Sequence, residues 1–301
     1  MNESILTAFL TAAVRVATPL LLAALGETIS ERGGVINLGI EGAMLAGALG
    51  AALGATAGGP WAGVLMAIAA GLTVAAVFAA IAVGAGADQI ITGTAMTLGS
   101  IGLTGAIYRS AYGPAGVGLT LPTLPVVPLP GLAAIPVLGP AFFQQSALTY
   151  IAFLLVPLLW WGLFRTRFGL ALRASGESAE HARAAGVRVT LVRVIGVLIG
   201  GGLAGLAGAS LVLAQVGTFA EKMTAGRGFI VIAIVVLGTW HPGRVLGAAL
   251  FFGAAMALQF LFQAFLLGVP YQVFLLLPYL LTLLVLAGVV GKVKAPADLG
   301  R

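Results

Sequence analysis

Few side chains in this 301-residue sequence could take part in chemistry, because it holds nine acidic residues, two histidines and no cysteine. Glu27 and Glu31 are four residues apart, which places them on one face of a helix. Asn37 and Glu41 have the same spacing. Such groups in a membrane protein tend to face the bundle interior or a water-filled path. What these two pairs can do therefore depends on the class of protein.

The two histidines do not complete a reactive group. His241 has no companion ligand for a metal site, and thiolate ligands are excluded because the sequence lacks cysteine. Neither a histidine cluster nor a mid-span carboxylate pair is present. The sequence therefore predicts no catalytic residue and no metal site.

The composition places the remaining polar groups in a membrane protein. Sixty per cent of the residues are apolar and 8% are charged, whereas a soluble domain has about 25% charged residues. Because charge is costly in hydrocarbon, we expect an all-α, polytopic transmembrane helix bundle. No polar linker divides residues 1–301, which indicates a single transmembrane domain. The net charge is +6, but a chain this apolar leaves no solvated basic surface of the kind that binds nucleic acid. Nucleic acid is therefore not an expected partner.

Apolar runs of about 20 residues predict the individual spans. A shorter run, 229–237, cannot cross a membrane unaided. Together the runs indicate about eight to ten spans with broken or re-entrant helices. The long runs are 5–25, 35–57, 61–83, 90–108, 147–164, 191–215, one that ends near 267, and 271–290.

Glycine and proline shape two further segments. The run from Gly200 to Gly208 formally contains GxGxxG, but the strand and soluble βαβ unit of a dinucleotide site are missing. Gly201 and Gly205 also form GxxxG, so we interpret the run as close helix packing. Seven of the 14 prolines lie in 113–140 and predict an extended, apolar loop outside the membrane.

The segment 165–193 is the main polar interruption, with six of the 15 basic residues. Ser178 can cap a short helix from Ala179 to Ala185, and Gly186 can end it. The alanines of this helix share one face, which could fit into a groove on another protein. The alternative is a solvated loop that only marks topology.

Basic residues also predict the orientation. Short basic loops stay in the cytoplasm, so segment 165–193 and the C-terminus are expected there. The resulting alternation puts 11 of the 15 basic residues inside and the 113–140 loop outside. We expect a multi-pass protein of the plasma (inner) membrane, surrounded by lipid.

Four stretches resemble ABC-importer permeases of the ribose and branched-chain amino acid family, in its nucleoside and simple-sugar branch. They are ATPLLLAALGETISERGGVINLGIEGAMLAGALGA, DQIITGTAMTLGSIGLTG, RASGESAEHARAAGVRVTLVRVIGVLIGGGLAGLAGASL and EKMTAGRGFIVIAIVVLGTWHPGRVLGAALFFG. The resemblance implies a transport subunit that pairs with a cytoplasmic ABC ATPase, a second permease subunit in a heterodimer, and an external substrate-binding lipoprotein. It also implies that segment 165–190 is the coupling loop that docks on the ATPase, through Gly176, Glu177, Glu180, Ala182, Arg183 and Gly186.

The sequence lacks the GxxxxGK[ST] loop that holds ATP phosphates. We therefore expect no cofactor on this chain, with ATP bound and hydrolysed on the partner subunit.

Candidate residues of a solute path carry alternatives. Asn37 and Glu41 could line the path or hold two helix ends in register. Asp88 and Gln89 could end a helix or gate the inner mouth. The glycines around Arg227 could expose the N-terminus of a half-helix to a polar solute, or form an outer turn. The candidate path residues are thus Asn37, Glu41, Asp88, Gln89, Gly226, Arg227 and Gly228.

Nucleosides are the substrates that the resemblance favours, with simple sugars as the alternative. An ion-coupled secondary transporter would need a carboxylate relay at mid-membrane, and only Arg15 lies clearly within an expected span. An intramembrane enzyme would need a catalytic group that the sequence does not show.

Overall fold

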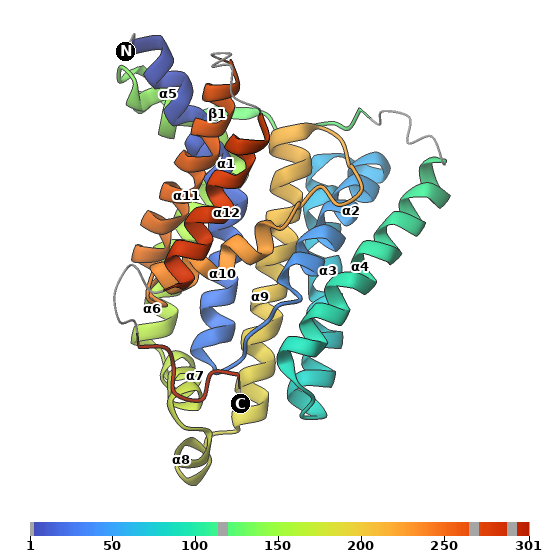
Figure 1. Ribbon diagram of the computed structural model, residues 1–301, viewed down its shortest axis with the longest axis vertical. Helices are drawn as coiled ribbons and strands as arrows, with labels where there is room; N and C mark the ends of the chain where they lie inside the picture. Colours follow the sequence, from blue (N-terminus) through green and yellow to red (C-terminus); the bar gives the residue numbers. More distant parts are fainter. Residues whose placement is uncertain (1–2, 114–119, 265–270, 288–293, 301) are drawn as a thin grey trace.

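A computed structural model describes residues 3–113, 120–264, 271–287 and 294–300, and this part of the chain is mostly helical (Figure 1). Six of its helices are long and apolar enough to cross a membrane. They are α1 (Glu3–Arg32), α2 (Ile40–Gly58), α3 (Pro60–Phe78, continued by a π-helical segment Ala79–Gly84), α4 (Gln89–Tyr112), α6 (Ala147–Arg165) and α9 (Val189–Leu211, continued by a π-helical segment Val212–Val216). The predicted all-α, polytopic bundle is confirmed.

The other elements are one more long helix, of 23 residues, and several shorter segments. They are α5 (Leu138–Phe142), α7 (Arg167–Glu177), α8 (Ala179–Ala184), α10 (Arg227–Leu237), α11 (Pro242–Ala264), α12 (Tyr271–Leu286), a 3₁₀ turn (Leu132–Ala134) and an antiparallel pair of short strands, β1 (Val126–Pro128) and β2 (Gln144–Ser146). The predicted short run is a helix of 11 residues, α10. It measures about 16 Å at 1.5 Å per residue, roughly half of a 30 Å hydrocarbon layer.

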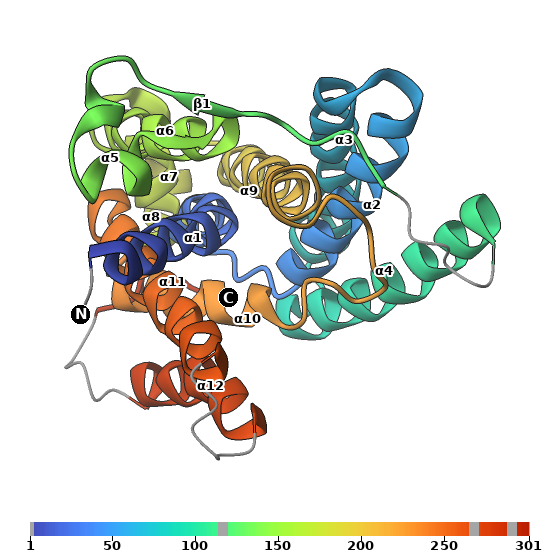
Figure 2. The same cartoon turned by 90° about the horizontal axis from the view of Figure 1, so that it is seen from above.

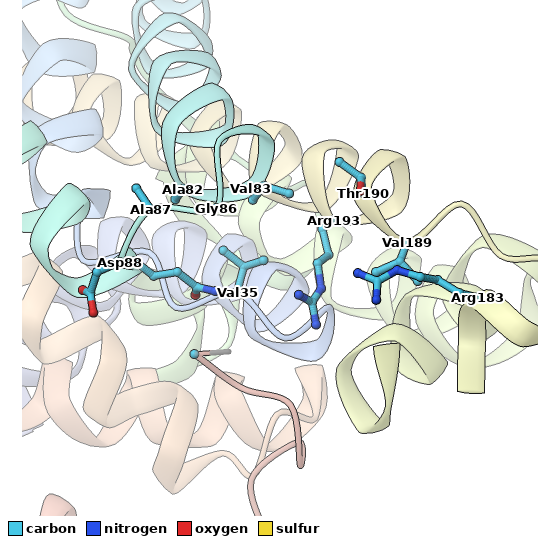
Figure 3. A pocket seen from close by; sticks show the side chains of 12 residues that line it. Val35, Ala82, Val83, Gly86, Ala87, Asp88, Arg183, Val189, Thr190 and Arg193 are labelled. Carbon is cyan, nitrogen blue, oxygen red and sulfur yellow. The ribbon is translucent and has the colours of Figure 1, made fainter. Parts of the chain in front are cut away.

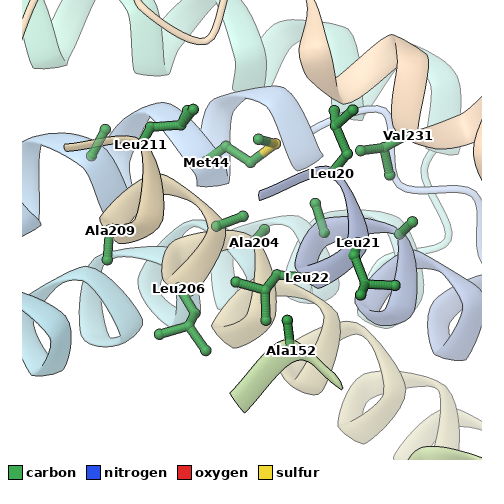
Figure 4. Close-up of a cluster of buried hydrophobic side chains, with 14 of the residues drawn as sticks. Leu20, Leu21, Leu22, Met44, Ala152, Ala204, Leu206, Ala209, Leu211 and Val231 are labelled. Atoms are coloured by element: carbon green, nitrogen blue, oxygen red, sulfur yellow. The ribbon is translucent and has the colours of Figure 1, made fainter. Parts of the chain in front are cut away.

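Helix α9 stands at the centre of the bundle. Figure 2 shows it between α1 on one side and α2 and α3 on the other, and it packs against all three. In Figure 1, α7 and α8 lie at one end of the bundle and the N-terminus at the other. The close-up in Figure 4 shows α1, α2, α6, α9 and α10 contributing to one apolar cluster that includes Leu20, Met44, Ala152, Leu211 and Val231.

The glycine-rich stretch of α9 brings helix backbones into direct contact. A Cβ placed on Gly47 of α2 would lie 2.5 Å from the Cα of Gly205. A Cβ placed on Gly26 of α1 would lie 2.8 Å from the carbonyl oxygen of Gly200. Gly201 and Gly205 both face α3 at Gly71. Close packing, the interpretation given to this run, is confirmed.

Two expected boundaries are wrong. The first span was expected to end at residue 25, but α1 continues to Arg32 and buries Glu27 and Glu31. The second was expected to begin at residue 35, but α2 begins at Ile40. The first error arises because Glu27 and Glu31 find hydrogen-bond donors inside the protein, the Asn37 amide and the Trp240 indole. Residues 33–39, called the connector below, are not helical.

Candidate functional site

The polar groups at the end of α1 bind backbone and indole donors. Glu27 Oε1 accepts a 2.8 Å hydrogen bond from the Asn37 amide, and a Glu31 carboxylate oxygen accepts one from the Trp240 indole N–H. Arg32 Nε donates to the Trp240 carbonyl at 3.0 Å. The end of α1 is thereby tied both to the connector and to the turn between α10 and α11. Within the described ranges the one ion pair lies elsewhere, between Arg109 and Glu221 at 2.8 Å.

Glu41, in the first turn of α2, occupies the N-terminus of the half-helix α10. Its two carboxylate oxygens accept hydrogen bonds from the amides of Gly226 (2.8 Å) and Gly228 (2.6 Å). A helix N-terminus favours an anion, because its first amides have no partner within the helix. A Cβ on Gly228 would lie 2.8 Å from the Glu41 Cα, so glycine permits this approach.

Further hydrogen bonds fix the chain just before α10. Gly226 has φ +79°, a left-handed conformation that suits glycine. Arg227 donates to the Met223 carbonyl at 2.8 Å, and the Tyr279 hydroxyl donates to the Ala225 carbonyl at 2.7 Å. The amides considered for a solute are thus bound by Glu41 in this structure. The part that Glu41, Gly226, Arg227 and Gly228 play in a path stays a prediction.

Asp88 and Gln89 mark the start of α4. The Asp88 carboxylate accepts a 2.8 Å hydrogen bond from the Ile91 amide and so caps the helix. Gln89 Oε1 accepts one from the Ile36 amide of the connector, also at 2.8 Å. Asn37 is buried in the connector, where its side chain accepts from the Gly39 amide. The connector therefore joins α1, α2 and α4. A gating role for these residues stays a prediction.

The expected coupling segment consists of two helices, α7 and α8. As predicted, Ser178 caps α8, with its hydroxyl accepting from the His181 amide at 3.3 Å. Gly186, at φ +83°, follows the end of α8 at Ala184. The alanines differ from expectation, because Ala179 and Ala182 are buried against Val189. The outward side chains of α8 include Glu180, His181 and Arg183.

Gly176 and Glu177 end α7 beside the connector. A Cβ on Gly176 would meet the carbonyl oxygen of Arg32 and approach the Gly34 amide to 3.1 Å. Glu177 is exposed. Coupling to an ATPase through Gly176, Glu177, Glu180, Ala182, Arg183 and Gly186 stays a prediction, but α7 does contact the end of α1.

Sequence reasoning missed the C-terminal tail. Asp298 accepts a 2.6 Å hydrogen bond from the Ala179 amide and donates its own amide to the Gly176 carbonyl at 2.8 Å. Gly300 donates to the Gly34 carbonyl at 3.1 Å. These contacts tie α7, α8 and the connector together. Nothing in the tail sequence beyond its single carboxylate, Asp298, marks it for this role.

Arg193 of α9 was also missed as a structural residue. It donates to the carbonyls of Gly33 (2.9 Å) and Ser175 (3.1 Å). It thus links α9 to the connector and to α7. The sequence signalled it only as one more basic residue of a polar loop.

A multi-pass helical bundle that contains a short half-helix such as α10 is typical of membrane transporters. The chain matches the model for the branched-chain amino acid transport system permease component over residues 9–286. It belongs to this family of ABC transporter permeases, which are transport subunits and not enzymes.

Three relatives illustrate the range of the family. A Haloferax volcanii protein, provisionally named the glucose ABC transporter permease TsgC13, is 44% identical, with 83% of this chain and 76% of the relative covered. The guanosine ABC transporter permease NupQ of Bacillus subtilis is 39% identical, with 97% and 95% covered. The nucleoside ABC transporter permease NupC of Lactococcus lactis is 33% identical, with 93% and 91% covered. No solved structure matches the chain.

Proposed function

We propose that this chain is the permease subunit of an ATP-driven importer that carries nucleosides across the plasma membrane. The observation that supports the substrate is the match to NupQ and NupC over more than nine-tenths of the chain. A neutral, hydroxyl-rich solute also suits the interior. There the protein's own amides already bind the Glu41 carboxylate, so it is not left for a charged solute. A simple sugar is the alternative, because the relative named for glucose is 44% identical.

The α7 and α8 end faces the cytoplasm in this proposal, together with the C-terminus. There an ABC ATPase docks on α8 and its neighbours, and ATP is bound and hydrolysed on that subunit. A second permease subunit completes the path as a heterodimer, and an external lipoprotein delivers the solute. Residues 1–301 act as one transmembrane domain, and the chain binds no cofactor of its own.

Competition for uptake tests the substrate. The complete importer is expressed in cells that lack their own nucleoside uptake, and entry of labelled guanosine is measured with and without a hundred-fold excess of glucose. We expect uptake that glucose does not reduce. Labelled glucose entering in place of guanosine would favour the sugar alternative and overturn the nucleoside assignment.

A second experiment tests the energy source. The ATPase subunit is inactivated in one culture, and in another the proton gradient is collapsed while ATP is held constant. Uptake should stop in the first and continue in the second. The reverse result would indicate an ion-coupled secondary transporter.

A further inference from the structure

One side of α9 lines two open cavities and is fully exposed only near the start of the helix. Its residues recur at three- and four-residue steps: Thr190, Leu191, Val194, Ile195, Leu198, Gly202 and Leu206. From Thr190 to Leu206 this face extends about 24 Å, at 1.5 Å per residue. Leu191 is 50% exposed whereas Leu206 is buried, so the face is open to its surroundings at the α8 end and covered at the other.

Two cavities follow each other along this face. The first, about 550 Å³, is lined by α9 from Val189 to Val194 and by Arg183, Val187 and Arg188 just before it. The second, about 320 Å³, lies between α9 and α3 and is lined only by Gly202 and apolar side chains, among them Ile68 and Leu72 of α3. The lining of the first cavity ends at Val194 and that of the second begins at Ile195, so the two follow each other along α9, basic at the α8 end and apolar beyond it; together they are called the groove below.

The first cavity has no acidic side chain in its lining, whereas Asp88 lines the cavity beside it. Neither Arg183 nor Arg188 forms an ion pair within the described part of the chain, and no carboxylate lines the 550 Å³ cavity. Figure 3 shows Arg183 extending from α8 toward Arg193, in an adjoining cavity of about 300 Å³ that Thr190 also lines. An anionic group at this end would meet two guanidinium groups and the hydroxyl of Thr190.

We propose that this groove binds an anionic phospholipid, with the phosphate between Arg183 and Arg188 and an acyl chain along α9. Basic pockets beside transmembrane helices suit acidic headgroups. A leaflet is about 15 Å deep, half of the hydrocarbon layer, so the groove can hold a chain beyond its headgroup. A soluble partner could reach the arginines but not the part of the groove between α3 and α9.

The test is lipid binding to the complete importer in detergent, measured by native mass spectrometry with phosphatidylglycerol and phosphatidylcholine. Combining Arg183→Gln with Arg188→Gln should weaken phosphatidylglycerol binding by about 25-fold, since each basic residue contributes about 1 kcal/mol, or five-fold, at an anionic surface. The matched control combines Arg165→Gln with Arg167→Gln, which removes the same charge from exposed positions outside the groove. It should change binding by less than two-fold.

A second variant tests the apolar part of the groove. A Cβ at Gly202 would lie 3.5 Å from Leu72, so Gly202→Ala fits and Gly202→Leu fills the space. Gly202→Leu should weaken the binding of both lipids, and Gly202→Ala should leave the binding of both unchanged. If the double variant fails to assemble, Arg188→Gln alone replaces it, because this change leaves α8 intact. It should weaken phosphatidylglycerol binding about five-fold.

Three results would overturn the proposal. Equal losses in the arginine variants and their control would indicate a diffuse surface charge effect. Competition by millimolar inorganic phosphate would show that the headgroup site needs no lipid chain. Lipid bound by the separate permease but excluded from the assembled importer would show that a protein subunit covers the groove.

Discussion

The two short helices α8 and α10 are both anchored by a carboxylate from a distant part of the sequence, but they depend on it to different degrees. In α8, Asp298 accepts from the Ala179 amide, and Ser178 provides a second, local cap. In α10, Gly226 precedes the helix without any side-chain cap, and Glu41 supplies both acceptors. The N-terminal amides of the exposed helix thus have two side-chain acceptors from different residues, whereas those of the buried helix have Glu41.

The largest effect is expected from Glu41→Ala. It would leave the Gly226 and Gly228 amides without their acceptor in a buried site, and hydrogen bonds to a charged group contribute about 1.5–3 kcal/mol each. We expect a loss of about 3 kcal/mol or more in the free energy of unfolding, with uptake abolished. The measurements are thermal unfolding of the purified importer and nucleoside uptake.

Two variants calibrate this result. Glu41→Gln keeps one acceptor oxygen and should fall between the wild type and Glu41→Ala. Glu180→Ala removes an exposed carboxylate from α8 and should change stability little. If Glu41→Ala and Glu180→Ala behave alike, the hydrogen bonds from the Gly226 and Gly228 amides to Glu41 do not stabilise α10 as argued.

The next largest effect is expected where α7 meets the end of α1. Gly176→Ala would press a methyl group against the Arg32 carbonyl, an overpacking that costs about 1–3 kcal/mol. Because this contact links the proposed coupling segment to α1, we expect uptake to fall while ATP hydrolysis continues. Gly162→Ala in α6 is the control, since a Cβ there meets nothing within 4 Å. Parallel losses of uptake and ATP hydrolysis would argue against a coupling role.

Residues of α8 itself give a related prediction. A bulky residue at Gly186 must adopt φ +83°, and one at Ala182 must displace Val189. A left-handed backbone costs an L-residue about 1–2 kcal/mol. Gly186→Val and Ala182→Phe should insert in the membrane yet uncouple ATP hydrolysis from uptake. Normal transport by both would leave segment 165–190 as a topology signal.

A smaller effect is expected from Asp298→Asn, because Ser178 still caps α8. Loss of a helix cap costs about 1 kcal/mol, and the amide side chain retains an acceptor. We expect a stability loss below this figure, with a measurable drop in the uptake obtained per ATP hydrolysed. Lys294→Gln, in an exposed part of the same tail, is the control. A loss as large as that of Glu41→Ala would show that the tail, and not Ser178, holds α8.

Local signals predicted the parts of these helices that depend on neighbouring residues. Ser178 and Gly186 bounded α8 to within one residue, and the apolar run gave the short length of α10. The glycines of α9 indicated close packing because small residues are what permit it.

These local signals could not predict contacts between residues that are far apart in the sequence. Glu41 is 185 residues from Gly226, and Asp298 is 119 from Ala179. Neither spacing nor composition pairs such groups. The same limit explains the wrong end of α1, since burial of Glu27 and Glu31 depends on the Asn37 amide and on Trp240.

The smallest effect in the comparison of α8 with α10 is expected from the two histidines, because His181 lies on α8 and His241 just after α10. Burial lowers the pKa of His241 from 6.5, and the nearby Arg244 and Arg32 lower it further. The unfolded chain therefore binds this proton before the folded one, so stability should fall as the pH drops below about 6.5. His241→Gln should flatten that slope, and His181→Gln, on the exposed helix, is compared with it in the uptake assay. Both variants should import at pH 7.5 as the wild type does, and loss of uptake in either would contradict the absence of a catalytic or metal-binding histidine.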